Sequence, residues 1–256
     1  RPYGIAALGS RIFVADTENS SVVSMDTATG EVRSIGRSGP REQLAQPVSV
    51  AVDQEGRIFV TDSGDLQVKA YAPDGKILWA VDRWGEKERF KRPTGLAWSP
   101  RGEVIVADTM AHRLVALSAA DGKFLREFPG EGKPGSLPSP ANVWVEKDGT
   151  ILVADPIACR VHLFSPAGEF LSGFGERGDS AGYLARPRGI ASDSDGNIYV
   201  VDAMFGNVQI FNRTGELLMH FGGHGDQPAT FQLPAGIFID EADKVYEIDP
   251  GEDGLY

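Results

Sequence analysis

Cysteine is almost absent from this sequence: the chain of 256 residues contains a single one, Cys159. An internal disulfide is therefore excluded, and a lone thiol fits a reducing or an oxidising compartment equally well. No run of about 18 apolar residues occurs, so no membrane span is expected. Long apolar patterns with the helical period of about 3.6 residues are missing too, which predicts few helices.

Motifs for common catalytic chemistry are also missing. The sequence has no G-x-S-x-G elbow, no phosphate-binding G-x-x-x-x-G-K-[ST] loop and no H-E-x-x-H zinc pair. The glycine-rich segment 222–225 is not followed by a helical pattern, which argues against a nucleotide-binding loop. We therefore expect no cofactor.

Basic residues are outnumbered. The 25 Lys and Arg residues against 36 Asp and Glu give a net charge of −11. An evenly acidic surface repels nucleic acid and anionic membranes, so neither is expected as a partner. Net charge does not exclude a local basic patch.

One pattern repeats along the whole chain. An apolar run followed by aspartate recurs at intervals of 46 or 47 residues, and it ends at Asp16, Asp62, Asp108, Asp155, Asp202 and Asp249. A second landmark keeps nearly the same interval, at Pro2, Pro47, Pro93, Pro140, Pro187 and Pro234. Two landmarks that recur at nearly the same interval predict one domain over residues 1–256, built from six copies of one unit.

Each unit is predicted to form four short strands. In the fifth unit, apolar and β-branched residues indicate strands over 189–193, 197–201, 208–211 and 216–221, with glycine-containing turns between them. Four-stranded units of this length are typical of propeller blades. We predict an all-β, six-bladed β-propeller. The last blade lacks its fourth strand and most of its third, and we expect residues outside this sequence to complete the ring.

The repeat resembles a known family. The pattern P-x-G-[IV]-A, then G-x-I-[FY]-V-x-D, then a loop leading to R-[VL]-x-x-[FL], is similar to the NHL repeat, and ILVADPIACRVHLF in the fourth unit matches it best. The resemblance covers the whole chain. It implies a propeller that serves as a protein-binding platform, an RNA binder or, in a few cases, an enzyme.

The six strand-end aspartates look like a charged ring. A role that recurs in every blade is expected to be structural, with each carboxylate capping its own turn through backbone N–H groups. In the third and fourth units the carboxylate has a second potential partner, because Arg113 and Arg160 follow five residues later.

Metal catalysis is one of the enzyme hypotheses. The family's relatives among the amidating lyases use a channel metal site, and three histidines from different blades suit catalytic zinc. His112, His162, His220 and His224 do not occupy such positions, so no metal is expected. A calcium-dependent lactonase is the other enzyme hypothesis, but only Asn142 and Glu146 lie where its ligands would be needed.

A basic segment supports an RNA-binding alternative. Positive and aromatic residues interleave there, which is typical of surfaces that stack bases. They are Arg83, Trp84, Lys87, Arg89, Phe90, Lys91 and Arg92, opposed by Glu86 and Glu88.

The loops after the six aspartates divide into two kinds. They are polar or acidic in the first, second and sixth units, with Glu18, Asp65, Glu252 and Asp253. In the third, fourth and fifth units they read DTMAHR, DPIACR and DAMFGN, which contribute Met110, His112, Ile157, Cys159, Met204 and Phe205. Ring geometry would bring these three loops side by side. Contiguous apolar area marks interaction sites, and Phe205 is the largest candidate anchor.

We therefore predict a non-enzymatic scaffold that binds a protein or peptide through this face. The alternatives are RNA binding by the basic segment and a channel-based metal-dependent lyase or lactonase. The resemblance to bacterial NHL proteins implies an extracytoplasmic location, in the periplasm or at the cell surface.

Overall fold

The computed structural model describes residues 2–37, 39–40, 42–85, 88–129, 134–225, 230–249 and 251. Nearly all its regular structure is β, as the missing helical patterns predict. Within the described residues the single helix is one 3-10 turn, η1 (Thr109–Ala111). None of these residues forms a helix long and apolar enough to cross a membrane.

Five antiparallel sheets have four strands each, paired in chain order. Their strands are β1 (Pro2–Leu8), β2 (Arg11–Asp16), β3 (Ser21–Asp26) and β4 (Val32–Ile35); β5 (Pro47–Val52), β6 (Ile58–Asp62), β7 (Gln67–Tyr71) and β8 (Ile77–Val81); β11 (Pro93–Ser99), β12 (Glu103–Asp108), β13 (Arg113–Ser118) and β14 (Phe124–Phe128); β15 (Asn142–Val145), β16 (Ile151–Asp155), β17 (Arg160–Phe164) and β18 (Phe170–Phe174); and β19 (Pro187–Ser192), β20 (Ile198–Asp202), β21 (Asn207–Phe211) and β22 (Leu217–Gly222).

Two smaller sheets complete the structure. β9 (Arg83–Trp84) pairs with β10 (Glu88–Arg89) in the segment between the second and third sheets. β23 (Gly236–Ile239) pairs with β24 (Val245–Ile248), so the last repeat forms two strands in the described residues. Among the described residues the complete four-stranded blades therefore number five rather than six.

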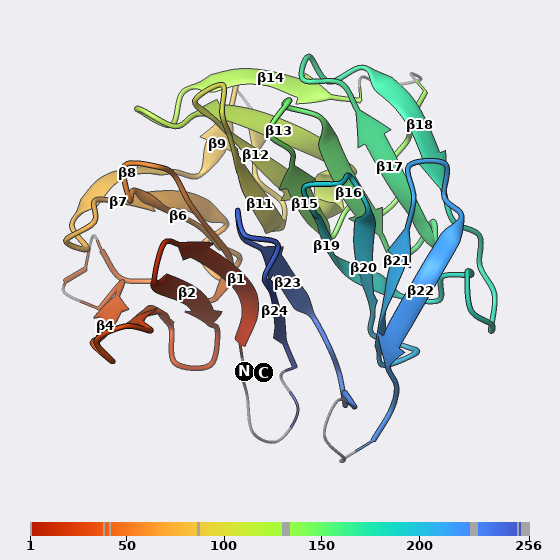
Figure 1. Cartoon of the computed structure of the whole chain (residues 1–256). Helices are drawn as coiled ribbons and strands as arrows, with labels where there is room; N and C mark the ends of the chain where they lie inside the picture. The colour runs from red at the N-terminus through yellow and green to blue at the C-terminus, as the bar shows by residue number, and fades with distance from the viewer. Residues whose placement is uncertain are drawn as a thin grey trace.

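The sheets are arranged around a centre (Figure 1). The first strand of each sheet faces inward, and these inner strands contact one another in the cyclic order β1, β5, β11, β15, β19, β23 and back to β1. This is the architecture of an all-β propeller with four-stranded antiparallel blades. In the fifth unit the observed strands lie within two residues of the predicted ones.

The second strand of a blade is buried on both faces, which explains its unbroken apolar run. Every residue of β6, β12 and β16 is buried. Neighbouring sheets meet through these side chains: Phe59 packs in one cluster with Val106 and Val115, and Ile105 in another with Val153. These side chains therefore form the core between neighbouring blades.

The glycine of the P-x-G motif allows inner strands to approach closely. A Cβ atom on Gly95 of β11 would lie 2.5 Å from the Cα of Asn142 on β15, and one on Gly236 of β23 would lie 2.3 Å from the carbonyl oxygen of Tyr3 on β1. Both contacts are with the backbone of the next sheet, so any side chain there would push the inner strands apart.

We expect Gly95→Ala to lower the free energy of unfolding by about 1–3 kcal/mol, because overpacking against backbone cannot be relieved by a rotamer change. Chemical denaturation measures this loss. Gly39→Ala is the matched control, since a Cβ atom there would meet nothing within 4 Å. Equal midpoints for the two variants would contradict the close packing of β11 on β15.

Candidate functional site

The strand-end aspartates organise one face of the propeller. Asp62, Asp108, Asp155 and Asp202 are fully buried. The carboxylate of Asp202 accepts N–H groups of Met204 and Phe205 in its own loop, and of Ala185 and Arg186 in the segment leading into β19. Asp62 and Asp155 likewise tie the loop between a blade's second and third strands to the segment before its first strand. Asp108 binds the N–H groups of Lys91 and Arg92 but, within the described residues, makes no side-chain bond to its own loop.

The arginines five residues later have other partners. Arg113 pairs with Glu127, and its guanidinium lies 5.0 Å from the ring centroid of Trp84. Arg160 donates to the carbonyl of Gly173 at 3.1 Å. In both blades the aspartate is therefore satisfied by backbone N–H groups.

Five of these loops share one conformation. The fourth residue after the aspartate has a positive φ in each of them, at Ser20 (51°), Leu66 (56°), His112 (59°), Cys159 (51°) and Gly206 (62°). The five loops therefore share a left-handed residue at the same position. The second residue after the aspartate is Glu18, Gly64, Met110, Ile157 or Met204 in successive blades.

The left-handed residue also anchors its loop to the next blade. Ser20 donates to Ala45 O at 2.9 Å, the Nδ1 atom of His112 lies 2.7 Å from Pro138 O, and the Cys159 thiol lies 3.4 Å from Ala185 O. Each acceptor is two residues before the repeated proline of the next unit, Pro47, Pro140 or Pro187. The sequence-based assignment of Cys159 to the binding surface is wrong, because its side chain is fully buried. His112 is exposed but holds its loop in place.

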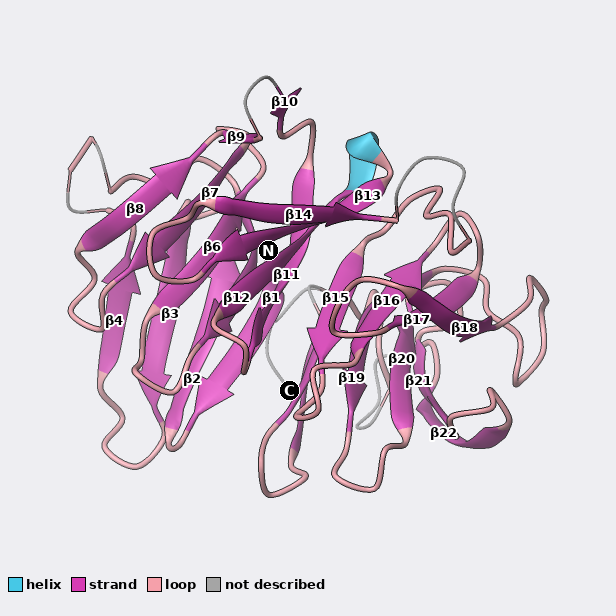
Figure 2. Cartoon of the chain, turned by 90° about the horizontal axis from the view of Figure 1, so that it is seen from above, coloured by secondary structure: helices cyan, strands magenta, loops and turns pink. Residues whose placement is uncertain are grey.

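Three apolar side chains project from these loops. Met110 is 53% exposed, Ile157 63% and Met204 60%. They occupy equivalent positions in three consecutive blades. Met110 belongs to η1, which lies at the same edge of the molecule as β9 and β10 (Figure 2). Phe205 is only half-buried rather than fully exposed, so it is not the main anchor that its size suggests. We call Met110, Ile157 and Met204 the apolar triad.

The acidic loops flank this triad. Glu18 and Asp65 are exposed, and the carboxylate of Asp65 lies 2.7 Å from the Nζ atom of Lys69. Glu252 and Asp253 lie outside the described residues.

The basic segment does not present its aromatic side chains. Trp84 is 4% exposed and Phe90 1%, and both belong to the core between the second and third sheets. Arg83 and Arg89 form ion pairs with Asp82, and Lys87 lies outside the described residues. Lys91 and Arg92 are exposed, and their backbone N–H groups bind Asp108. The prediction of Trp84 as a base-stacking residue is therefore wrong.

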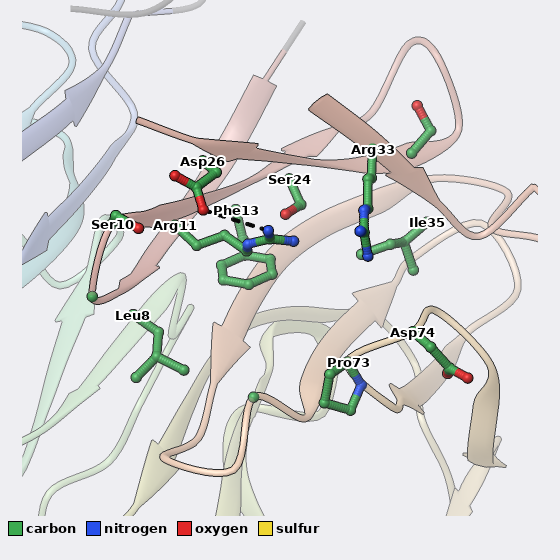
Figure 3. A pocket seen from close by; sticks show the side chains of 13 residues that line it. Leu8, Ser10, Arg11, Phe13, Ser24, Asp26, Arg33, Ile35, Pro73 and Asp74 are labelled. Atoms are coloured by element: carbon green, nitrogen blue, oxygen red, sulfur yellow. Dashed lines mark ion pairs between the residues drawn. The ribbon is translucent and has the colours of Figure 1, made fainter. Parts of the chain in front are cut away.

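The structure also has cavities that the sequence does not indicate. One of about 770 Å³ lies between the first and second sheets, and its lining includes Arg11, Asp26, Arg33 and Asp74 (Figure 3). Arg11 pairs with Asp26 at 3.6 Å and with Glu31, which also holds Arg33. These arginines are neutralised within the chain, so the cavity has no excess charge to attract a ligand.

A second cavity of about 660 Å³ occupies the channel between the inner strands. Trp144 and Phe238 stand there at positions that are alanine in the other four sheets, with ring centroids 5.4 Å apart. The indole N–H of Trp144 donates to Ser192 Oγ at 3.0 Å. Both rings line this cavity.

The residues of the enzyme hypotheses do not converge. No three His, Cys, Asp or Glu side chains of the described residues form a metal-binding group. His162 is buried, and burial lowers its pKa. His220 is exposed on β22, and His224 Nε2 lies 2.7 Å from Met204 O. Glu146 forms an ion pair with Arg213 at 2.7 Å, and Asn142 Oδ1 accepts the N–H of Val143.

Sequence comparison places this architecture in a family. A model described as outer membrane protein assembly factor BamB matches residues 3–136, just over half of the chain, and the model for the NHL repeat matches residues 184–211. The chain belongs to the BamB-type repeat family and is an NHL-repeat β-propeller. The NHL match contains β20 and the loop that carries Met204. No functionally curated protein matches the sequence.

Solved structures similar to this NHL propeller have diverse roles. Virginiamycin B lyase from Staphylococcus aureus is 14% identical, with a TM-score of 0.70 over 96% of this chain and 76% of the lyase. A protein of unknown function from Bacteroides thetaiotaomicron is 17% identical (TM-score 0.77, 99% and 68% covered). A chain of a nidogen/laminin complex is 18% identical (TM-score 0.66, 86% and 79% covered). At these identities the likeness shows the fold alone.

Proposed function

We propose that this NHL propeller is a non-enzymatic binding module that docks a protein or peptide on the apolar triad. The observation that carries the proposal is the placement of Met110, Ile157 and Met204: each is more than half exposed, on a loop held in place by hydrogen bonds. The strand-end aspartate caps the loops of Ile157 and Met204, and the contact between His112 and Pro138 O holds the loop of Met110. Rigid loops lower the entropy cost of binding, and methionine adapts to varied partners.

Exposure alone does not distinguish the triad from other apolar residues. Outer strands also expose leucines, and these recur in four blades at Leu78, Leu125, Leu171 and Leu218. A feature of nearly every blade fits a structural role, whereas the triad is confined to three adjacent blades. This contrast supports the loop face as the docking surface and makes the outer leucines a matched control.

The comparisons add support of a general kind. The model that matches half of the chain is named for an assembly factor, and one structural neighbour belongs to a protein–protein complex. The likeness to the lyase concerns the fold, and no metal-binding group accompanies it in the described residues. We keep the extracytoplasmic location as part of the proposal.

We also propose that β23 and β24 are the inner half of a sixth blade. β23 packs between β19 and β1, and Asp249 accepts N–H groups of Gln232 and Leu233 as the other strand-end aspartates do in their blades. This would place six equivalent loops around the face.

Photo-crosslinking tests the docking surface. With a photoreactive amino acid at position 157, we expect a specific crosslinked partner from native extract, because Ile157 is the most exposed member of the triad. The same group at position 171, on the outer strand β18, is the control and should not capture that partner. Identical products from both positions, or none from position 157, would count against the proposal.

A further inference from the structure

Three arginines lie where the inner strands begin, on the same side as the apolar triad. Arg92 directly precedes β11, Arg186 directly precedes β19, and Arg188 is the second residue of β19. Asp108 accepts the backbone N–H of Arg92 at 2.7 Å, and Asp202 accepts that of Arg186 at 3.0 Å. The strand-end aspartates therefore fix the backbone at both sites.

The inner strands contact one another in a ring, so residues at their starts lie around one mouth of the channel. Burial lowers the pKa of Arg188, the positive charges of Arg186 and Arg92 lower it further, and an interaction with Tyr3 partly offsets them. Tyr3 comes from the first sheet, Arg92 from the third, and Arg186 and Arg188 from the fifth. Because these sheets alternate around the ring, the arginines lie around the mouth of its central channel.

The positions that match Arg188 in the alternating sheets are small. They are Val48 in the second sheet, Ala141 in the fourth and Ala235 beside β23. Small side chains there leave room at the channel mouth for the long arginines. Arg188 itself is partly buried, whereas Arg92 and Arg186 are exposed.

In the part of the chain that the structure describes, no carboxylate pairs with this cluster. Within the described residues, none of the three guanidinium groups forms an ion pair, although acidic residues outnumber basic ones by 36 to 25 in the sequence. Other arginines of the propeller are paired, such as Arg57 with Asp53 and Arg126 with Glu103. The nearby carboxylates of Asp108 and Asp202 bind backbone N–H groups. Like charges held together without a counter-charge cost free energy, which a bound anion would recover.

We infer that Arg92, Arg186 and Arg188 form an anion-binding site at the channel mouth, for a ligand that presents carboxylate or phosphate groups. Guanidinium groups match the planar oxygen pairs of both through paired hydrogen bonds. Three converging charges favour an anion that carries more than one charge. This site is separate from the apolar triad and does not depend on it.

Small polyanions test the site without a known partner. Inorganic pyrophosphate and citrate, each titrated at constant ionic strength with chloride as the balancing anion, represent the phosphate and carboxylate classes. At saturation we expect the thermal midpoint of the native chain to rise by about 2 °C or more. In Arg188→Gln the dissociation constant from calorimetry should increase by about tenfold or more, the loss expected for charged hydrogen bonds.

Arg101→Gln is the matched control, because Arg101 is an exposed arginine in the turn between β11 and β12, at the opposite end of the inner strands. The Arg101→Gln variant should bind both anions as the native chain does. If Arg188→Gln does not fold, the double variant Arg92→Gln with Arg186→Gln replaces it, since both side chains are exposed and their backbone bonds remain. A larger rise of the thermal midpoint with pyrophosphate than with citrate assigns the ligand to the phosphate class. A larger rise with citrate assigns it to the carboxylate class. No response of the native chain, or an equal loss in Arg101→Gln, would overturn the inference.

Discussion

Glu247→Gln is expected to stabilise the propeller at alkaline pH by on the order of 2–4 kcal/mol, judged from the pKa shift of Glu247 at about 1.4 kcal/mol per pKa unit. Glu247 lies on β24 and is 5% exposed. The same position holds valine in the five other repeats, at Val14, Val60, Val106, Val153 and Val200. Neither carboxylate oxygen has a hydrogen-bond partner within the described residues. A buried acid without partners is far more stable when neutral.

The direction of the pH dependence follows from the pKa. Burial, aided by the negative charge of Asp249, raises the pKa of Glu247 from 4.5 to about 8. The folded state therefore holds this proton more tightly than the unfolded state does. The resulting stabilisation is complete below about pH 4.5 and is lost as the pH rises through about 8. Glutamine is neutral at every pH, so the variant does not suffer this loss.

Urea denaturation at pH 5, 7 and 8.5 measures the effect as the difference between variant and parent, which cancels the other titrating groups. Glu103→Gln is the control, because Glu103 is buried but binds Arg126 at 2.7 and 2.8 Å. The Glu103→Gln variant should be less stable than the parent at neutral pH, because it loses the ion pair with Arg126. A pH-independent difference between Glu247→Gln and the parent would contradict the account of Glu247.

Lys69→Met is expected to lower the free energy of unfolding by about 3–5 kcal/mol, the usual cost of leaving a buried charge unpaired. The side chain of Lys69 is 3% exposed, and its Nζ atom lies 2.8 Å from Asp62, 2.7 Å from Asp65 and 2.7 Å from the carbonyl of Gln43. Burial alone would raise the pKa of Asp62, but hydrogen bonds from Lys69 and from backbone N–H groups outweigh it and keep the pKa below its ordinary value. Without Lys69, that carboxylate is buried with backbone donors alone.

Lys76→Met provides the comparison for this variant. Lys76 is 78% exposed and pairs with Asp74 at 2.8 Å, so solvent screens the pair and its loss should leave the denaturation midpoint nearly unchanged. Both variants remove a lysine that pairs with aspartate, and only burial differs. Similar denaturation midpoints for the two would contradict a structural role for the Lys69 ion pair.

The blades could be predicted from sequence because their signals are local and repeated. The apolar run before Asp155 and the proline at Pro140 recur in every unit, and each blade buries the same faces. The number of complete blades could not be predicted with equal certainty, because pairing in the last repeat depends on strands that its own residues do not specify.

The loop face was predicted in part. Position relative to the aspartate identified Met110, Ile157 and Met204, because equivalent loops project equivalent side chains. Cys159 was misassigned because its burial depends on the next blade: the thiol is fully buried and lies 3.4 Å from Ala185 O, in the segment that leads into β19. A signal was available: the fourth residue after the aspartate is the one that must bend the loop.

Features between blades could not be predicted from one repeat at a time. Trp84 lies in a basic segment but packs into the core against a neighbouring sheet, and Trp144 meets Phe238 from another repeat. Arg92 and Arg188 come together only when the ring closes. Glu247, in contrast, was visible in the sequence as one glutamate in a column of valines.

The central claim is that the apolar triad docks a partner, and the most direct test is the affinity for the partner crosslinked at position 157. The triple variant Met110→Ser, Ile157→Ser, Met204→Ser is compared with Leu125→Ser, Leu171→Ser, Leu218→Ser, which removes three exposed apolar side chains from outer strands. The account predicts that the first set raises the dissociation constant by about 30-fold or more, on the scale of interface hot spots, and that the second leaves it nearly unchanged. Unchanged affinity in the triad variant, or an equal loss in both, would contradict the claim.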